Sequence, residues 1–265
     1  MRWKRDVIDG RPYSWYRCTQ WVYDTAFVDK TNDSRYAGTF QQVWYATTTS
    51  DVCHFITTLE GSTYDLSGQL FSVGDTAIWM PGYNMPKAEL ERHINNRGKG
   101  NNIYWLITPE MYNNIMFPTM KKYLDPNRKG YNDNSMRPII IYRLGETYLI
   151  AAEAALMLGD KADAVNYINI LRERAGYDGH KASMDITADK VDIDFILDER
   201  TRELLGEHTR WFDLVRTGKL IERVKKHDDY DAYRNIKWYH CIRPIPQNQI
   251  DRTISGTPYP QNEGW

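Results

Sequence analysis

The 265-residue sequence has few cysteines, no long apolar run and almost no net charge. Its three cysteines, Cys18, Cys53 and Cys241, are widely spaced and form no CxxC pair, so neither a zinc site nor a disulfide framework is indicated. No apolar run approaches the roughly 20 residues that a membrane-spanning helix needs. The formal net charge of −1 gives no electrostatic basis for binding nucleic acid or an anionic membrane. What remains is a globular chain of one large domain or two small ones.

Phenylalanine is also scarce, with 7 residues against 19 tyrosines and 9 tryptophans. Tyr and Trp combine a flat apolar face with a polar tip, which suits half-wet surfaces such as carbohydrate platforms and protein interfaces. The same side chains also fill the cores of loop-rich proteins. Composition alone therefore leaves both interpretations open.

The first half of the chain, residues 1–138, is rich in Gly, Asn, Pro, Tyr and Thr. Short strands are predicted in "QQVWYATTT" (41–49) and "DTAIWM" (75–80), and one short helix in "TPEMYNNIMFP" (108–118). The rest is expected to form long ordered loops. Loops of that length are unusual in a compact domain unless they are functional or lie over a scaffold.

Residues 139–227 carry a helical pattern, and residues 228–265 are expected to be irregular. One helix is predicted over 142–159, ending at Gly159, and Asp160 is placed to cap a second helix over 161–176. This pair is similar to a tetratricopeptide-type hairpin, which cannot bury its own faces as a single unit. The apolar stripe of the second helix comprises Ala164, Ile168, Leu171 and Ala175.

The segment "ILDERTRELLGEHTRWFDLVRTGKL" (196–220) poses the question of catalysis, because Glu199 and Glu203 share one helix face. At about 100° per residue, Arg200 falls in the middle of the apolar stripe, and Arg202 falls on the far side with Asp198. A buried guanidinium must be paired, since stranding its charge costs several kcal/mol. The apolar members of the stripe are Ile193, Leu197 and Leu204, with Ile196 beside them.

Two roles compete for these carboxylates. A glycosidase needs one acid whose pKa is raised, whereas the neighbouring arginines would lower carboxylate pKa values. We therefore predict a structural ion network, with the arginine paired by an acid of the same segment or of the helical hairpin, and no catalytic residue. The predicted members are Glu146, Glu153, Arg200, Glu203, Arg210 and Asp213.

Searches for cofactor and metal motifs return little. The six histidines show no metal-ligand spacing, and there is no GxSxG motif. "DPNRKGYNDN" (125–134) resembles a calcium loop at Asp125, Asn127 and Gly130, but Lys129 and Met136 replace oxygen ligands. We predict a polar turn there, and no metal site or cofactor.

Five ordered stretches together resemble the SusD/RagB family of outer-membrane nutrient-binding lipoproteins. The resemblance implies a mainly α fold, with tetratricopeptide-like helical hairpins, a large irregular loop-rich region on the ligand side and short β segments. It also implies a non-catalytic protein that captures glycans, or peptides in some members, and passes them to a SusC-like, TonB-dependent transporter. The stretches are "DSRYAGTF" (33–40), "KKYLDP" (121–126), "RPIIIYRLGETYLIAAEAALMLGD" (137–160), the charged segment above and "RPIPQNQI…PYPQNEGW" near the end.

The chain also departs from the family pattern. Full-length members are longer and begin with a signal peptide and a lipidated cysteine, whereas "MRWKRDVIDGRPYSWY" has no apolar signal region. The resemblance thus places this chain in the C-terminal part of such a protein and implies surface anchoring for the parent. We expect these 265 residues by themselves to fold poorly or to expose an apolar patch.

No motif transfers ligand-binding residues from the family to this sequence. Aromatics in turn-rich parts of the first half are the natural candidates, because sugar rings stack on aromatic faces. They are Trp44, Tyr45, Trp79 and Tyr83, with Asn84 as a polar partner, and core packing is the competing role for each. A tetratricopeptide-type peptide-binding module and a glycoside hydrolase using Glu199 or Glu203 are the alternative functions.

Overall fold

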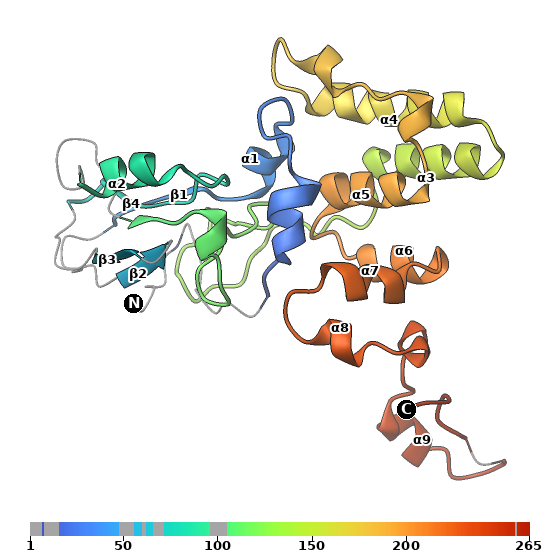
Figure 1. Ribbon diagram of the computed structural model, residues 1–265. Coiled ribbons are helices and arrows are strands. Elements are labelled where there is room, and N and C mark those ends of the chain that lie inside the picture. The colour runs from blue at the N-terminus through green and yellow to red at the C-terminus, as the bar shows by residue number, and fades with distance from the viewer. Residues whose placement is uncertain are drawn as a thin grey trace. The chain divides into compact units, whose positions relative to one another are not determined.

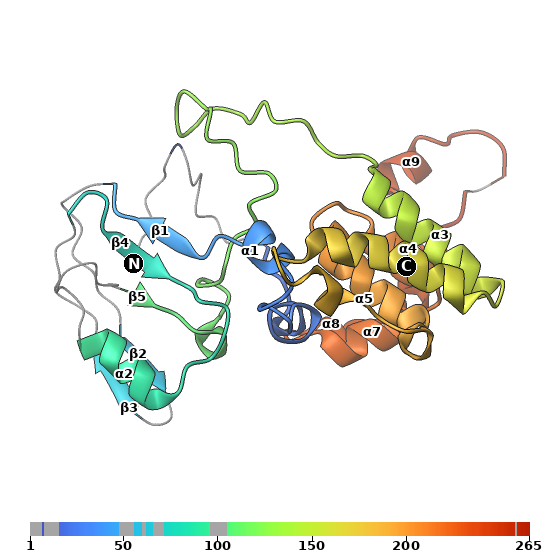
Figure 2. The same cartoon turned by 90° about the horizontal axis from the view of Figure 1, so that it is seen from above.

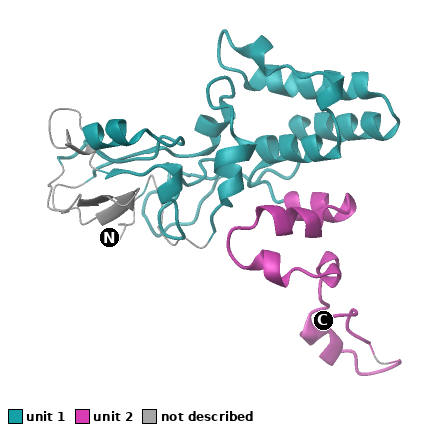
Figure 3. Ribbon diagram, in the orientation of Figure 1, with its two compact units in different colours: residues 1–208 teal, residues 209–265 magenta. Residues whose placement is uncertain are grey.

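The computed structural model describes residues 7, 16–47, 56–59, 62–65, 72–95, 105–257 and 259–265. The fold is mainly α with a few short strands, as predicted (Figure 1). The chain divides into two compact units, residues 1–208 and 209–265, each described here by itself (Figure 3). None of the helices in the described ranges is long and apolar enough to cross a lipid bilayer.

The predicted helical hairpin is present in the first unit as α3 (Leu144–Met157) and α4 (Lys161–Ala175). Gly159 takes a φ of +84° at the turn, a conformation that glycine adopts without strain. The Asp160 carboxylate then accepts a hydrogen bond from the backbone N–H of Asp163 and caps α4. The four residues of the predicted α4 stripe are all buried, which confirms the pattern.

A third helix, α5 (Ile193–Leu204), packs against α3 in the same layer of helices (Figure 2). Alanines at the α3–α4 contact let the two backbones approach closely, and larger aliphatic side chains fill the space beside α5. One buried cluster comprises Ala152, Ala155, Ala164, Ile168, Val191 and Ile196, and a second comprises Leu149, Leu171 and Leu204.

The outer face of α3 is apolar and exposed. Leu144, Ile150 and Met157 are 67%, 53% and 68% exposed, whereas the acidic residues of this helix, Glu146 and Glu153, are buried. Helices that are hydrophobic all round are normally covered on every side. The expected apolar patch is therefore present, and it lies on this helix.

The first half holds more regular structure than predicted. A sheet has the strand order β1 (Val43–Tyr45), β4 (Thr76–Trp79), β5 (Trp105–Leu106), with β1 antiparallel and β5 parallel to β4. β1 and β4 confirm the two predicted strands, although residues 48 and 49 lie outside the described ranges. A second antiparallel pair is formed by β2 (Ile56–Leu59) and β3 (Ser62–Asp65).

The prediction of long loops elsewhere in this half was wrong at three helices. They are the π-helix η1 (Val22–Ala26), α1 (Arg35–Thr39) and α2 (Lys87–Asn95). At five to nine residues, these helices are too short to show a 3.6-residue period in the sequence. The helix predicted within 108–118 is reduced to one 3₁₀ turn, η2 (Pro109–Met111).

Three apolar clusters among the described residues hold this half together, one of them formed by Met85, Leu90 and Leu106. Ile78, Met80 and Trp105 centre the cluster at the sheet, and η1 and α1 share an aromatic cluster. In the aromatic cluster, Tyr36 and Phe40 have ring centroids 5.0 Å apart. The rings meet at tilted or edge-on angles, as aromatic pairs prefer.

The second unit contains short helices and a folded-back tail. The Trp265 indole N–H donates to the carbonyl oxygens of Tyr239 and Ile242, 3.2 and 2.9 Å away. The tail expected to be irregular thus has side-chain anchors. The helices of this unit are α6 (Arg210–Arg216), α7 (Leu220–His227), α8 (Ala232–Asn235), η5 (Trp238–Cys241) and α9 (Gln247–Asp251).

In the first unit, the connection between α4 and α5 holds two 3₁₀ turns, η3 (Lys181–Met184) and η4 (Ala188–Lys190).

Candidate functional site

Glu199 on α5 is fully buried and surrounded by guanidinium groups. Its carboxylate oxygens lie 2.7 Å from Arg35 Nη1, 2.9 Å from Arg172 Nη1 and 2.7 Å from Arg202 Nη2. Burial by itself would raise the pKa of Glu199, but these arginines outweigh it and hold the pKa well below the usual range. A general acid needs the opposite shift and access to a substrate.

Two further glutamates, Glu203 and Glu207, are also bound by basic side chains. Glu203 Oε1 lies 2.6 Å from both Arg143 Nη1 and Arg174 Nη2, and Glu207 lies 2.5 Å from Lys122 Nζ and 2.8 Å from Arg143 Nε. Burial opposes ionisation of both acids, yet these cations keep both pKa values lowered. We call the three glutamates and their basic partners the charged cluster.

The charged cluster differs in its partners from the network predicted from the sequence. Arg200 is buried in the apolar face as the helical angle indicates, and its Nη2 lies 3.3 Å from Glu146 Oε1. Glu203 is instead bound by three arginines, Arg35 of α1, Arg143 and Arg174. Arg202 does not point away from the cluster, because it donates to Glu199.

The remaining predicted members lie elsewhere. Glu153 is buried on α3. Arg210 and Asp213 belong to the second unit, where Asp213 is buried and accepts from Arg216 at 2.8 Å.

The charged cluster predicts acid sensitivity. The three glutamates have lower pKa values in the folded chain than the value of 4.5 for a free glutamate, so the unfolded chain binds more protons at acidic pH. Their stabilisation is full above about pH 4.5 and is lost as the pH falls further through the folded-state values. We expect thermal unfolding followed by circular dichroism to give a steady Tm near neutral pH and a steep fall in acid. A Tm that rises towards pH 3 would contradict this assignment.

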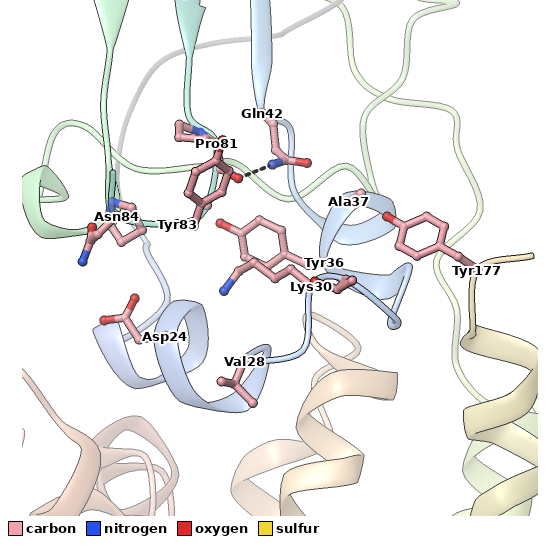
Figure 4. A pocket seen from close by; sticks show the side chains of 13 residues that line it. Asp24, Val28, Lys30, Tyr36, Ala37, Gln42, Pro81, Tyr83, Asn84 and Tyr177 are labelled. Carbon is pink, nitrogen blue, oxygen red and sulfur yellow. Dashed lines mark hydrogen bonds between the residues drawn. The ribbon is translucent and has the colours of Figure 1, made fainter. Parts of the chain in front are cut away.

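A separate cavity of about 680 Å³ lies in the first unit, between η1, α1, the turn after β4 and the loop after α4 (Figure 4). Its volume is within the usual range for small-ligand sites. Aromatic rings and polar side chains alternate around it. The lining residues are Asp24, Val28, Lys30, Thr31, Tyr36, Ala37, Gln42, Pro81, Gly82, Tyr83, Asn84, Pro109 and Tyr177. We call it the tyrosine pocket.

The base of the tyrosine pocket is formed by Tyr36 and Lys30. Tyr36 is 2% exposed, burial raises its pKa to about 12, and a hydrogen bond with the Tyr112 side chain works against that shift. Lys30 Nζ lies 4.7 Å from the Tyr36 ring centroid and donates to the Tyr23 carbonyl. Burial lowers the pKa of Lys30, and the charge of Asp24 works against that shift. The base thus places an aromatic ring beside a partly desolvated ammonium group.

The rim is a turn that follows β4. Gly82 has a φ of +81° and packs on Tyr36 so tightly that an added Cβ would lie 2.4 Å from Tyr36 Cε1. The Gln42 amide donates to the Pro81 carbonyl at 2.9 Å, which fixes the turn (Figure 4). Tyr83 beside it is 48% exposed, so its ring is open to a ligand.

The structure brings together two of the five predicted ligand residues. Tyr83 and Asn84 line the tyrosine pocket, with Asn84 Oδ1 accepting from the backbone N–H of Glu110. Trp44 packs against the sheet cluster, and Trp79 meets His93 edge-on with centroids 5.4 Å apart. Tyr45 is exposed on β1 but does not line the pocket.

Sequence reasoning missed Asp24, Lys30, Tyr36, Gln42 and Tyr177. One signal was available for Tyr36, because it lies within the "DSRYAGTF" stretch. No local pattern marks Tyr177, which follows α4 and lies outside the turn-rich first half of the chain.

The calcium-like loop folds as the predicted polar turn. Asp125 accepts hydrogen bonds from the backbone N–H groups of Asn127 and Met136 and from the Ser135 hydroxyl. These bonds, with that from Met136 the largest influence, lower the pKa of Asp125. Within the described residues, no group of three or more His, Cys, Asp or Glu side chains is arranged to hold a metal ion.

Comparison with known proteins gives the family. The model of the SusD family matches residues 7–265, almost the whole chain. The chain belongs to the SusD family. It is 35% identical over 141 residues to SusD-like protein P25 of Formosa agariphila, which covers 51% of this chain and 26% of that protein. It is 39% identical over 89 residues to SusD-like protein P38 of the same organism, which covers 32% of this chain and 18% of that protein. The matched stretches of this SusD-family chain thus span about a quarter or less of each relative.

Proposed function

We propose that this SusD-family chain is a non-catalytic carbohydrate-binding region that holds a short stretch of glycan in the tyrosine pocket. The observation that carries the proposal is the lining itself, which combines three tyrosine side chains with amide, carboxylate and ammonium groups. Membership of the SusD family supports a role in nutrient uptake.

The chemistry of the lining matches a sugar. The C–H face of a pyranose ring packs on an aromatic face, and Tyr83 and Tyr177 both expose part of their rings. Asn84 and Asp24 supply a donor amide and an acceptor carboxylate at the rim for ring hydroxyls.

Glycan delivery completes the proposal at the level of the whole protein. We infer that the bound glycan passes to a SusC-like, TonB-dependent transporter, and that the parent protein is a lipoprotein at the outer-membrane surface. Family membership supports this role. The third candidate function, a glycoside hydrolase, finds no support at Glu199 and Glu203, which are buried and bound by arginines.

Affinity electrophoresis tests the pocket directly. Native gels containing starch, xylan, laminarin, pectin or alginate would identify a polysaccharide that retards the chain. We expect the Tyr83→Ala, Tyr177→Ala double variant to lose most of the retardation. A loss of at least tenfold in affinity, about 1.4 kcal/mol, is the expected scale, because both stacking faces disappear.

Tyr45→Ala is the matched control, because it removes an exposed tyrosine of the same unit that lies outside the pocket. Retardation should be unchanged in this variant and in Trp44→Ala. If Tyr45→Ala loses retardation while the double variant keeps it, the strand face predicted from the sequence is the site. No retardation by any polysaccharide, together with binding to a peptide array, would favour the peptide-binding alternative.

A further inference from the structure

We propose that Arg35 is a positioning residue for the tyrosine pocket: it fixes one pocket wall without lining the pocket itself. This inference rests on the proposed function, because it is measured through ligand affinity. It gives the charged cluster a role in binding in addition to its role in stability.

The first step is that two consecutive residues of α1, Arg35 and Tyr36, point their side chains in opposite directions. Tyr36 points into the tyrosine pocket (Figure 4), whereas Arg35 points into the charged cluster. Arg35 Nη1 lies 2.7 Å from Glu199 Oε1 and 3.2 Å from Glu203 Oε2. Its Nη2 lies 2.7 Å from Asp33 Oδ2, so both terminal nitrogens of the guanidinium group are paired with carboxylates.

The second step is the share of the pocket that this segment provides. Residues 28–37 supply five of the thirteen lining residues, among them Lys30 and Tyr36. α1 has only five residues and no side-chain cap, so its own hydrogen bonds hold it weakly. External anchors must therefore set its position.

The third step is the second anchor of the same wall. The Tyr177 backbone N–H donates to the Asn32 carbonyl at 2.9 Å, and the Ser34 N–H donates to the Ala175 carbonyl at 2.9 Å. His180 Nδ1 lies 2.7 Å from Asn32 Oδ1. These contacts fix the segment at the end of α4 and place Tyr177, while Arg35 fixes it to α5. Without the Arg35 contacts, the segment is held at the end of α4, by the aromatic cluster and by the Phe40–Met120 bridge, and α1 is free to shift towards the space that the guanidinium leaves.

Arg143 of the charged cluster does not share this position. Arg143 binds Glu203 and Glu207 with comparable geometry, but it immediately precedes α3 and lies outside the pocket lining. It is therefore the matched control for an arginine that stabilises the fold without holding a pocket wall.

The test is isothermal titration of Arg35→Gln and Arg143→Gln, at a temperature well below both unfolding transitions. The titrant is an oligosaccharide cut from the polysaccharide that retards the unaltered chain most strongly. We expect Arg35→Gln to raise the Kd at least tenfold with an unchanged number of sites, and Arg143→Gln to leave the Kd within twofold. A purely structural role would instead reduce the number of competent sites and leave the Kd unchanged.

A second variant, Arg35→Lys, keeps the inference testable if Arg35→Gln folds poorly. Lysine keeps the positive charge but cannot bind two carboxylates with the geometry of a guanidinium group. We expect a Kd increase of about threefold, together with faster hydrogen exchange at the Gly38 and Phe40 amides. An unchanged Kd in both Arg35 variants, or equal increases in the Arg143 and Arg35 variants, would overturn the inference. If the unaltered chain binds no saccharide, the proposed function itself fails, and this inference fails with it.

Discussion

Replacing Glu199 with glutamine is expected to lower the free energy of unfolding by about 3–5 kcal/mol. The change removes the one buried charge that Arg35, Arg172 and Arg202 share, and leaves three guanidinium groups close together. An uncompensated buried charge is costly because protein cannot solvate it as water does. For a chain of this size the Tm should fall by roughly 6–20 °C. Urea and thermal unfolding would both measure the effect.

Glu89→Gln is the matched control for this change. Glu89 on α2 is partly exposed, and its partner His93 is 3.9 Å away, so the pair should contribute less than about 1 kcal/mol. The two variants make the same chemical change in the same unit and differ in burial. Equal stability losses in the two variants would show that the charged cluster is not a buried, mutually dependent set.

Gly82→Ala is expected to destabilise the first unit by about 2–5 kcal/mol and to abolish saccharide binding. The left-handed backbone conformation costs an alanine about 1–2 kcal/mol. The new Cβ, 2.4 Å from Tyr36 Cε1, adds an overpacking cost of about 1–3 kcal/mol. Relief of that contact requires either the rim turn or the Tyr36 ring to move, and both line the tyrosine pocket.

Gly74→Ala separates the two costs. Gly74 also has a positive φ, of 92°, but nothing lies within 4 Å of an added Cβ. This variant should show only the backbone cost and should bind saccharide normally. If both variants lose equal stability, or if Gly82→Ala binds as the unaltered chain does, the packing of Gly82 on Tyr36 does not shape the pocket.

The sequence was most informative where a helix buries a regular face. The 100° rotation per residue places Arg200 among apolar side chains, and the structure has it buried. The same pattern could not name its partner among four acids, because the choice of Glu146 depends on how α3 lies on α5. Sequence periodicity shows which residues share a face of one helix, whereas an ion pair between helices depends on how the two helices pack.

The partners of Glu199 and Glu203 show the same limit. Arg35 is 164 positions from Glu199 in the chain, and no local pattern links them. The tyrosine pocket likewise joins Tyr36 of α1, Tyr83 of the turn after β4 and Tyr177 of the loop after α4. Single-sequence reasoning found Tyr83 because aromatics in turns are often exposed, and missed Tyr36 because that residue is buried on a short helix that no periodic pattern marks.

The exposed apolar face of α3 has a consequence for handling the protein. The exposed apolar residues Leu144, Ile150 and Met157 should make the isolated polypeptide associate at raised concentration. Such association would use non-specific hydrophobic contacts. Chaperone demand during synthesis and loss of material on concentration would then follow from this helix, while the affinity of the tyrosine pocket stays the same. The colloidal behaviour of the chain and its ligand recognition are thus governed by different surfaces.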